Sequence, residues 1–251
     1  MLRYFISLCL LLGYFSGQCQ DKPIDLQPKD TVTYNERYGL RVGIDLSKPI
    51  LSMVREGYTG LEFVGDYRLT QKIYLAAELG NEKYDRQEDL YNFTTSGSYI
   101  KFGVDYNTYE NWYGMNNSIF IGGRYAISTF DQTVNDHTIY DDNRYWHPDG
   151  FAPGIPGKQE FGGLSAMWVE FILGAKAELF ANFFLGISAR LELLVNNKEA
   201  DNFSNLWIPG FNKTAEGSNF GVGYNYSLTY FIPLYKKAKK PKKPKETETE
   251  E

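Results

Sequence analysis

Residues 167–193 read MWVEFILGAKAELFANFFLGISARLEL, and this stretch decides the fold. In its first part, 167–179, and again in 183–193, every second residue is apolar, while the residues between them include several charges and glycines. Strict alternation over this length predicts β-strands with two unlike faces. Only residues 180–182 separate the two runs, so the sequence predicts an antiparallel hairpin with a tight turn.

The same alternation occurs in six further segments, which brings the predicted strands to eight: 38–46, 61–69, 73–79, 99–106, 118–127 and 220–232. The connections differ in length: 70–72 and 180–182 are tight turns, 48–57 is intermediate, and 84–97, 130–163 and 196–217 are long and polar. The one exception to the pattern is 108–117, which should be a short turn and is longer. Short turns at one end and long loops at the other are typical of outer-membrane barrels. We therefore expect an all-β fold, a closed antiparallel eight-stranded transmembrane β-barrel with long extracellular loops and short periplasmic turns.

The orientation of the two strand faces separates a membrane barrel from a soluble one. A soluble lipocalin-like barrel points its apolar face inward, whereas a membrane barrel turns it towards lipid. Strands of about ten residues are long enough to cross a bilayer at a tilt. Aromatic residues also gather near the predicted strand ends, as interfacial girdles do; these are Tyr38, Tyr58, Tyr67, Tyr99, Tyr106, Phe183, Phe220 and Tyr230. We favour the membrane barrel, with a soluble lipocalin-like periplasmic barrel as the alternative.

The polar strand faces carry charges of both signs beside many glycines and serines. Such a composition suits a narrow interior that is filled by ion pairs and conducts poorly, in contrast to an open porin. The predicted interior charge network comprises Arg41, Asp45, Glu62, Asp66, Arg68, Glu78, Lys101, Asp105, Arg124, Glu170, Lys176, Glu178, Arg190 and Glu192.

The ends of the chain differ from the predicted barrel, which we place at 37–235. Residues 1–20 have a basic start, a short apolar run and a small-residue zone, which predicts a secretory signal peptide. Residues 21–36 are expected to be an N-terminal periplasmic segment, and the Lys/Glu-rich stretch 236–251 a disordered tail. Both cysteines lie within 1–20, so we expect no disulfide in the exported chain. The mean hydropathy of −0.41 excludes a bundle of transmembrane helices.

Across 37–235 the chain resembles the small eight-stranded outer-membrane barrels of the OmpA/OmpX type. It is most similar to uncharacterised Bacteroidota outer-membrane barrel proteins with domain-of-unknown-function labels. The features that carry this resemblance are Gln18-Cys19-Gln20, the first strand Arg41-Val42-Gly43-Ile44-Asp45, and the closing Gly221-Val222-Gly223-Tyr224-Asn225-Tyr226. The resemblance is architectural. It implies a porin-like barrel in the outer membrane of a Gram-negative cell, with periplasmic termini, and it names no activity.

The loops contain no legible catalytic arrangement. Both histidines, His137 and His147, lie in the longest loop with several aspartates, but their spacing matches no metal motif. Ser128 is separated from His137 by loop sequence, so no nucleophile and base are paired. We therefore predict no enzyme, no catalytic residues, no metal site and no cofactor.

The same loop offers a candidate contact surface, because exposed aromatics often mark contact sites; its members are Tyr140, Tyr145, Trp146, His147 and Phe151. The expected partners are outer-membrane lipid and, through the 130–163 loop or the Lys-rich tail, envelope proteins; nucleic acid is not expected. A structural or partner-interaction role follows. The alternative is an outer-membrane enzyme or ligand-binding barrel that uses the 130–163 loop.

Overall fold

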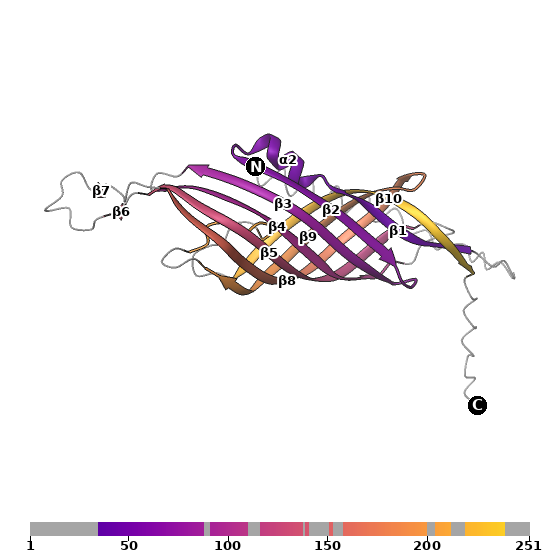
Figure 1. Ribbon diagram of the computed structural model, residues 1–251. Helices are drawn as coiled ribbons and strands as arrows, with labels where there is room; N and C mark the ends of the chain where they lie inside the picture. The colour runs from indigo at the N-terminus through magenta and orange to yellow at the C-terminus, as the bar shows by residue number, and fades with distance from the viewer. Residues whose placement is uncertain are drawn as a thin grey trace, which may run out of the picture. The chain divides into compact units, whose positions relative to one another are not determined.

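The computed structural model describes residues 35–87, 91–109, 116–137, 139–140, 151–152, 158–199, 204–211 and 219–238. In this part of the chain, eight antiparallel strands close into a barrel in the order β1-β10-β9-β8-β5-β4-β3-β2 (Figure 1). The predicted fold class, an all-β ring of eight antiparallel strands, is confirmed. A short sheet, β6-β7, is separate from the barrel.

The barrel strands are long, from 11 residues in β1 to 22 in β8. Their bounds are β1 Asn35–Asp45, β2 Tyr58–Arg68, β3 Ile73–Gln87, β4 Tyr91–Asn107, β5 Ser118–His137, β8 Gln159–Phe180, β9 Phe183–Lys198 and β10 Phe220–Ala238. The other elements are α2 Ser47–Val54, β6 Ile139–Tyr140 and β7 Phe151–Ala152. We call the end of the barrel near α2 the α2 end, and the end with the tight connections 69–72 and 181–182 the turn end.

No helix in the described part of the chain has the length and apolar character needed to span a bilayer.

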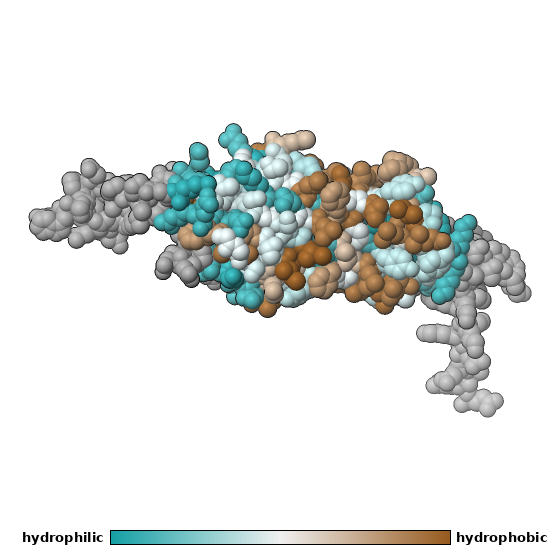
Figure 2. All heavy atoms as spheres, in the orientation of Figure 1, coloured by the Kyte–Doolittle hydropathy of each residue, from teal (hydrophilic) through white to brown (hydrophobic). Residues whose placement is uncertain are grey.

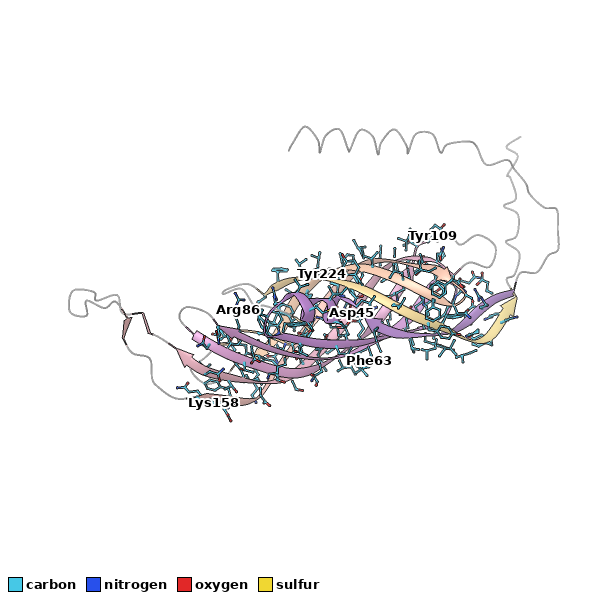
Figure 3. The ribbon with its side chains drawn as sticks, turned by 90° about the horizontal axis from the view of Figure 1, so that it is seen from above. Asp45, Phe63, Arg86, Tyr109, Lys158 and Tyr224 are labelled. Atoms are coloured by element: carbon cyan, nitrogen blue, oxygen red, sulfur yellow. The ribbon has the colours of Figure 1, made fainter. Side chains whose placement is uncertain are left out.

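The two faces of each strand point in opposite directions, as the alternation predicts. Apolar side chains face outward: Phe63, Phe171 and Leu191 are about half exposed. Charged side chains such as Asp45 face the interior (Figure 3). On the face seen in Figure 2, hydrophobic residues gather between two hydrophilic ends. The barrel is therefore inverted relative to a soluble globular protein, with its polar groups inside and its apolar surface outside.

The long loop predicted for 84–97 is wrong. β3 continues to Gln87 and β4 begins at Tyr91, so only residues 88–90 connect them. The loops at 130–163 and 196–217 are also shorter than predicted, because β5, β8 and β9 extend into both. These extensions carry polar residues on both faces. The alternation of apolar and polar residues therefore stops several residues before the strand ends, and the sequence pattern predicts a shorter strand.

The first and last strands also run past their predicted limits. β1 begins at Asn35 and β10 ends at Ala238, whereas the sequence places the barrel at 37–235 and a disordered tail from Lys236. The two strands pair along this extension, where Glu36 lies opposite Lys237. Cross-strand pairs of opposite charge favour such a ribbon. The expected signal peptide lies outside the described residues, as do positions 21–34 and 239–251.

Three of the predicted girdle aromatics are buried instead of facing lipid. Tyr38, Tyr58 and Tyr99 are 4%, 2% and 3% exposed. Tyr38 lies beside a β-bulge of β10, and its ring is covered by the Tyr235 ring at 5.3 Å and the Arg68 guanidinium at 4.6 Å. Tyr58 and Tyr99 are each an even number of residues away from the inward-facing charges of their strands. They therefore point to the same inner face, although their residue type suggested the girdle.

Candidate functional site in the barrel lumen

The register between neighbouring strands sets which charged side chains meet in the lumen. Lys101 on β4 lies opposite Glu78 on β3, and Arg124 on β5 lies opposite Glu170 on β8. Side chains that face each other across antiparallel strands on the same face are close enough to interact. The polar faces therefore form rows of opposite charges across the barrel wall.

Near the turn end, one carboxylate holds two cations from opposite walls. Asp66 accepts a hydrogen bond from Arg41 Nε at 2.6 Å and one from Lys176 Nζ at 2.7 Å. The Arg41 guanidinium also lies over the rings of Tyr74 and Phe184, at 4.7 and 5.3 Å from their centroids. Arg41 and Asp66 are both at least 96% buried. Arg41 and Asp66 come from neighbouring strands, whereas the Asp66–Lys176 pair joins β2 to β8 across the lumen.

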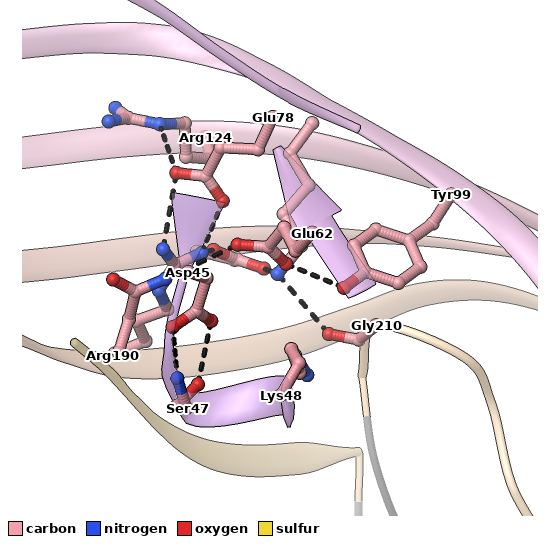
Figure 4. Close-up of polar contacts among 12 residues, drawn as sticks. Asp45, Ser47, Lys48, Glu62, Glu78, Tyr99, Arg124, Arg190 and Gly210 are labelled. Carbon is pink, nitrogen blue, oxygen red and sulfur yellow. Dashed lines mark hydrogen bonds and ion pairs between the residues drawn. The ribbon is translucent and has the colours of Figure 1, made fainter. Parts of the chain in front are cut away.

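The middle of the lumen is built around Arg190 (Figure 4). Its guanidinium donates to both oxygens of Glu78, at 2.6 and 3.2 Å, and to Glu170 at 3.0 Å. Lys101 lies 2.8 Å from the other oxygen of Glu170. Arg124 lies 3.5 Å from Glu78 and 2.6 Å from Asp105. Glu78, Glu170 and Asp105 are therefore each held by at least one of these three cations, in one connected network.

A second cluster, near the α2 end, contains two residues that the sequence did not indicate. Lys48 on α2 extends into the barrel, and its Nζ lies 2.6 Å from Glu82 Oε1 on β3. Burial disfavours the charged form of Lys48, but Glu82 and Glu62 outweigh this effect and raise the pKa of Lys48 above its ordinary value. Tyr99 donates to Glu62 at 2.6 Å and lies 3.2 Å from Glu82.

A segment of the β9–β10 connection, residues 204–211, fills the α2 end of the lumen. We call it the plug. Its Trp207, Ile208 and Phe211 are almost completely buried. Gly210 donates its N–H to Glu82 at 3.3 Å and accepts from Lys101 Nζ at 3.3 Å. The sequence assigned this stretch to a polar loop, but its apolar residues pack inside the barrel.

Not every predicted member of the network makes an ion pair within it. Asp45 accepts from the backbone N–H and hydroxyl of Ser47, at 2.7 and 2.6 Å, and so begins α2. Arg68 pairs at the turn end with Glu36, at 2.9 Å. Glu178 is partly exposed there and pairs with Arg37. Glu192 is buried, and its Oε2 has no hydrogen-bond partner among the described residues.

The space left in the lumen is small. A cavity of about 30 Å³ borders Asp66, Glu78, Arg124, Lys176 and Arg190. This volume holds roughly two water molecules. In the described residues, the ion pairs and the plug therefore occupy most of the cross-section.

The loop-based candidates are only partly described. The backbones of Tyr140 and Phe151 pair in the β6-β7 sheet. Tyr145, Trp146 and His147 lie outside the described residues. Ser128 is buried in the wall of the barrel, where it donates to the Ser98 carbonyl at 3.4 Å. Among the described residues, no group of three His, Cys, Asp or Glu side chains could hold a metal ion.

The chain belongs to the family described as "Domain of unknown function (DUF6048)", whose model matches residues 1–237. A search of curated proteins found no match. Among solved structures, the chain is similar to the crystal structure of Acinetobacter baumannii CarO2, with 11% identity and a TM-score of 0.40. That match covers 79% of this chain and 99% of the other. The likeness is too distant to carry an argument about function.

Proposed function

We propose that this DUF6048 protein is an outer-membrane β-barrel with a closed lumen and a structural or partner-interaction role, not an open porin and not an enzyme. The β-barrel itself is established above. The membrane location, the orientation and the role are the proposal. An origin in Gram-negative Bacteroidota, with the chain exported by its signal peptide, is part of the same proposal.

The main support for the proposal is that apolar side chains face outward and charged side chains face inward. Outward residues on several strands, such as Leu75 on β3, Phe102 on β4 and Leu173 on β8, are 44%, 49% and 51% exposed. In water this surface would be a large exposed apolar patch, which soluble proteins avoid. In a bilayer it matches the apolar band, about 25 Å tall, of transmembrane barrels. A soluble lipocalin-like barrel would face the opposite way.

The orientation follows from the connections. An even number of strands brings Asn35 and Ala238 to the same end of the barrel, where they pair. In bacterial outer-membrane barrels the short turns are periplasmic and the longer loops extracellular. We therefore assign the turn end and both termini to the periplasm, and the α2 end to the cell exterior.

Fractionation of cells tests the location. We expect the protein in the outer-membrane fraction, with an electrophoretic mobility that changes on heating because a folded barrel resists detergent. Release with the soluble periplasmic fraction would favour the lipocalin-like alternative.

A crosslinked pulldown from intact cells tests the role. The wild type is compared with a variant in which Tyr140, Tyr145, Trp146 and Phe151 are replaced by Ala, and with a chain that ends at residue 238. Loss of one specific partner in either variant would identify the interacting surface. Absence of any partner, together with hydrolase activity abolished by His147→Ala, would instead support the enzyme alternative.

A further inference from the structure

At the α2 end of the lumen, three aromatic rings of the barrel wall pack around a fourth ring from the plug. Tyr58, Tyr84 and Phe93 come from β2, β3 and β4, and Trp207 comes from the plug. The centroid of the Tyr84 ring lies 4.6 Å from that of Trp207 and 6.1 Å from those of Tyr58 and Phe93. Leu51 of α2 packs against the same rings. We call this arrangement the aromatic chamber.

The walls and the contents of the aromatic chamber have different origins. The walls belong to paired strands, since Tyr58 lies opposite Tyr84 in the β2–β3 register. The contents, Trp207 and Leu51, belong to the plug and α2, and neither segment is hydrogen-bonded into the barrel sheet as a strand. Displacing these two segments would empty the chamber without breaking the strand pairing of the barrel.

Two buried carboxylates, which we call the acidic floor, lie close to the chamber. Glu82 is fully buried on the same strand as Tyr84, and Glu62 lies nearby, joined to it through Tyr99. The cation held there is the Lys48 ammonium, 2.6 Å from Glu82 and 5.9 Å from the centroid of the Tyr99 ring. A carboxylate beside aromatic faces is a favourable environment for an ammonium group.

Three buried polar atoms in or beside the chamber have no hydrogen-bond partner among the described residues. They are Tyr58 Oη, Trp207 Nε1 and Thr95 Oγ1, in residues that are 2%, 2% and 0% exposed. Thr95 lies opposite Tyr84 on β4. A buried donor without an acceptor costs about 1–3 kcal/mol. The plug therefore fills the chamber but leaves these buried polar atoms without hydrogen-bond partners among the described residues.

α2 lies against the barrel without belonging to its sheet. β1 pairs with its neighbours only as far as Asp45 opposite Ser227 and Ile44 opposite Phe63. Beyond that point α2 replaces the strand; the Gly60 N–H of β2 donates to Ser52 Oγ at 3.0 Å, and the Tyr58 N–H donates to the Arg55 carbonyl, just after α2, at 3.3 Å. Lys48 provides its ionic contact with the interior.

We propose that the aromatic chamber and its floor form a binding site for a small amphiphilic cation, an aromatic group carrying a primary ammonium. In the structure, Lys48 supplies the ammonium and Trp207 the aromatic ring from within the chain. The ligand would replace both, with its ammonium on Glu82 and its ring in the place of Trp207, against Tyr58 and Tyr84. This site goes beyond the proposed function and does not depend on the location of the barrel.

The probe is 2-phenylethylammonium, titrated by calorimetry into the folded full-length protein in detergent micelles. Lys48→Met removes the internal ammonium and leaves Glu82 free to bind the probe. We therefore expect the Kd of the probe to be at least about tenfold lower for Lys48→Met than for the wild type, which is the gain that one charge-assisted hydrogen bond provides. The double variant Lys48→Met/Glu82→Gln should lose this gain. The neutral 2-phenylethanol and the anionic 3-phenylpropionate should bind Lys48→Met at least about tenfold more weakly than the probe.

Lys83→Met is the matched control, because Lys83 is exposed on the other face of β3, where it pairs with Asp85 at 3.4 Å. It should bind the probe like the wild type. Folding of each variant is checked by its heat-modifiable migration, and the probe should raise the unfolding temperature of Lys48→Met but not of Lys83→Met. If Lys48→Met does not fold, the wild type and Glu82→Gln are compared at millimolar probe, where the wild type alone should bind. Equal binding by these pairs, or equal binding of 2-phenylethanol, would overturn the proposal.

Discussion

Replacing Arg190 by Met tests whether the lumen is filled or open. Arg190 is 6% exposed and donates to Glu78 through two hydrogen bonds and to Glu170 through one. Removing one partner of a buried ion pair costs about 3–5 kcal/mol, because the other charge is left buried. Glu170 keeps its ion pair with Lys101 at 2.8 Å, whereas the ion pair left to Glu78 among the described residues is the longer one with Arg124, at 3.5 Å. The cost therefore falls mainly on Glu78.

Because Arg124 retains part of that interaction, we expect a loss near the lower limit, about 3 kcal/mol of unfolding free energy. A loss of this size is roughly a hundredfold change in the unfolding equilibrium. Urea titration of the refolded barrel in lipid vesicles, read by electrophoretic mobility without heating, measures it. The double variant Arg190→Met/Glu78→Gln removes the stranded charge, so the double-mutant cycle should return a coupling energy of about 1–3 kcal/mol.

A smaller loss would refute the reasoning. Exposed ion pairs contribute about 0–1 kcal/mol, since water solvates both charges. If Arg190→Met costs no more than that, and the double variant shows no coupling, then Arg190 is hydrated and the lumen is an open aqueous channel.

Three further predictions follow from the same structure. In planar-bilayer recordings the wild type should show no stable open state, and large reproducible conductance would contradict the filled lumen. Gly210→Ala should release the plug and accelerate proteolysis at 199–219, because Gly210 has a φ of +84° and an added Cβ would lie 2.6 Å from Tyr99 Cγ. Gly163→Ala is the control: Gly163 has a φ of +69°, but an added Cβ would meet no atom within 4 Å, so the plug should stay protected. Leu191→Lys on the outward face of β9 should cost about 2–4 kcal/mol in vesicle unfolding experiments, whereas Asn81→Lys, beyond the apolar part of β3, should cost about 0–1 kcal/mol; equal costs would argue against a bilayer around the barrel.

The sequence showed which residues of each strand lie on its polar face. Successive side chains point to opposite faces of a strand until a β-bulge interrupts the alternation. If 183–193 is a strand, Arg190 and Glu192 lie on the same face, and the apolar residues that alternate with them lie on the other face. The same parity places Tyr99 with Lys101, although residue type alone suggested the girdle. The closed ring of eight strands followed from the number of alternating segments.

Glu82 shows where this reasoning stopped. It has the parity of Glu78 and lies four residues further along β3, but Asn81 and Lys83 on the outward face are polar. The alternation of apolar and polar residues therefore ends while the strand continues. Extending the strand by parity alone would have added Glu82 to the network.

Lys48 and the plug had no comparable signal. By itself the sequence determined the eight strands, their two faces and most of the charges inside, because these depend on a local period of two residues. Only the tertiary structure decided which charges pair, that α2 sends Lys48 into the lumen, and that Trp207 and Gly210 close its end. Those contacts depend on the register between strands and on the paths of connections that carry no period, and both are fixed only when the barrel closes.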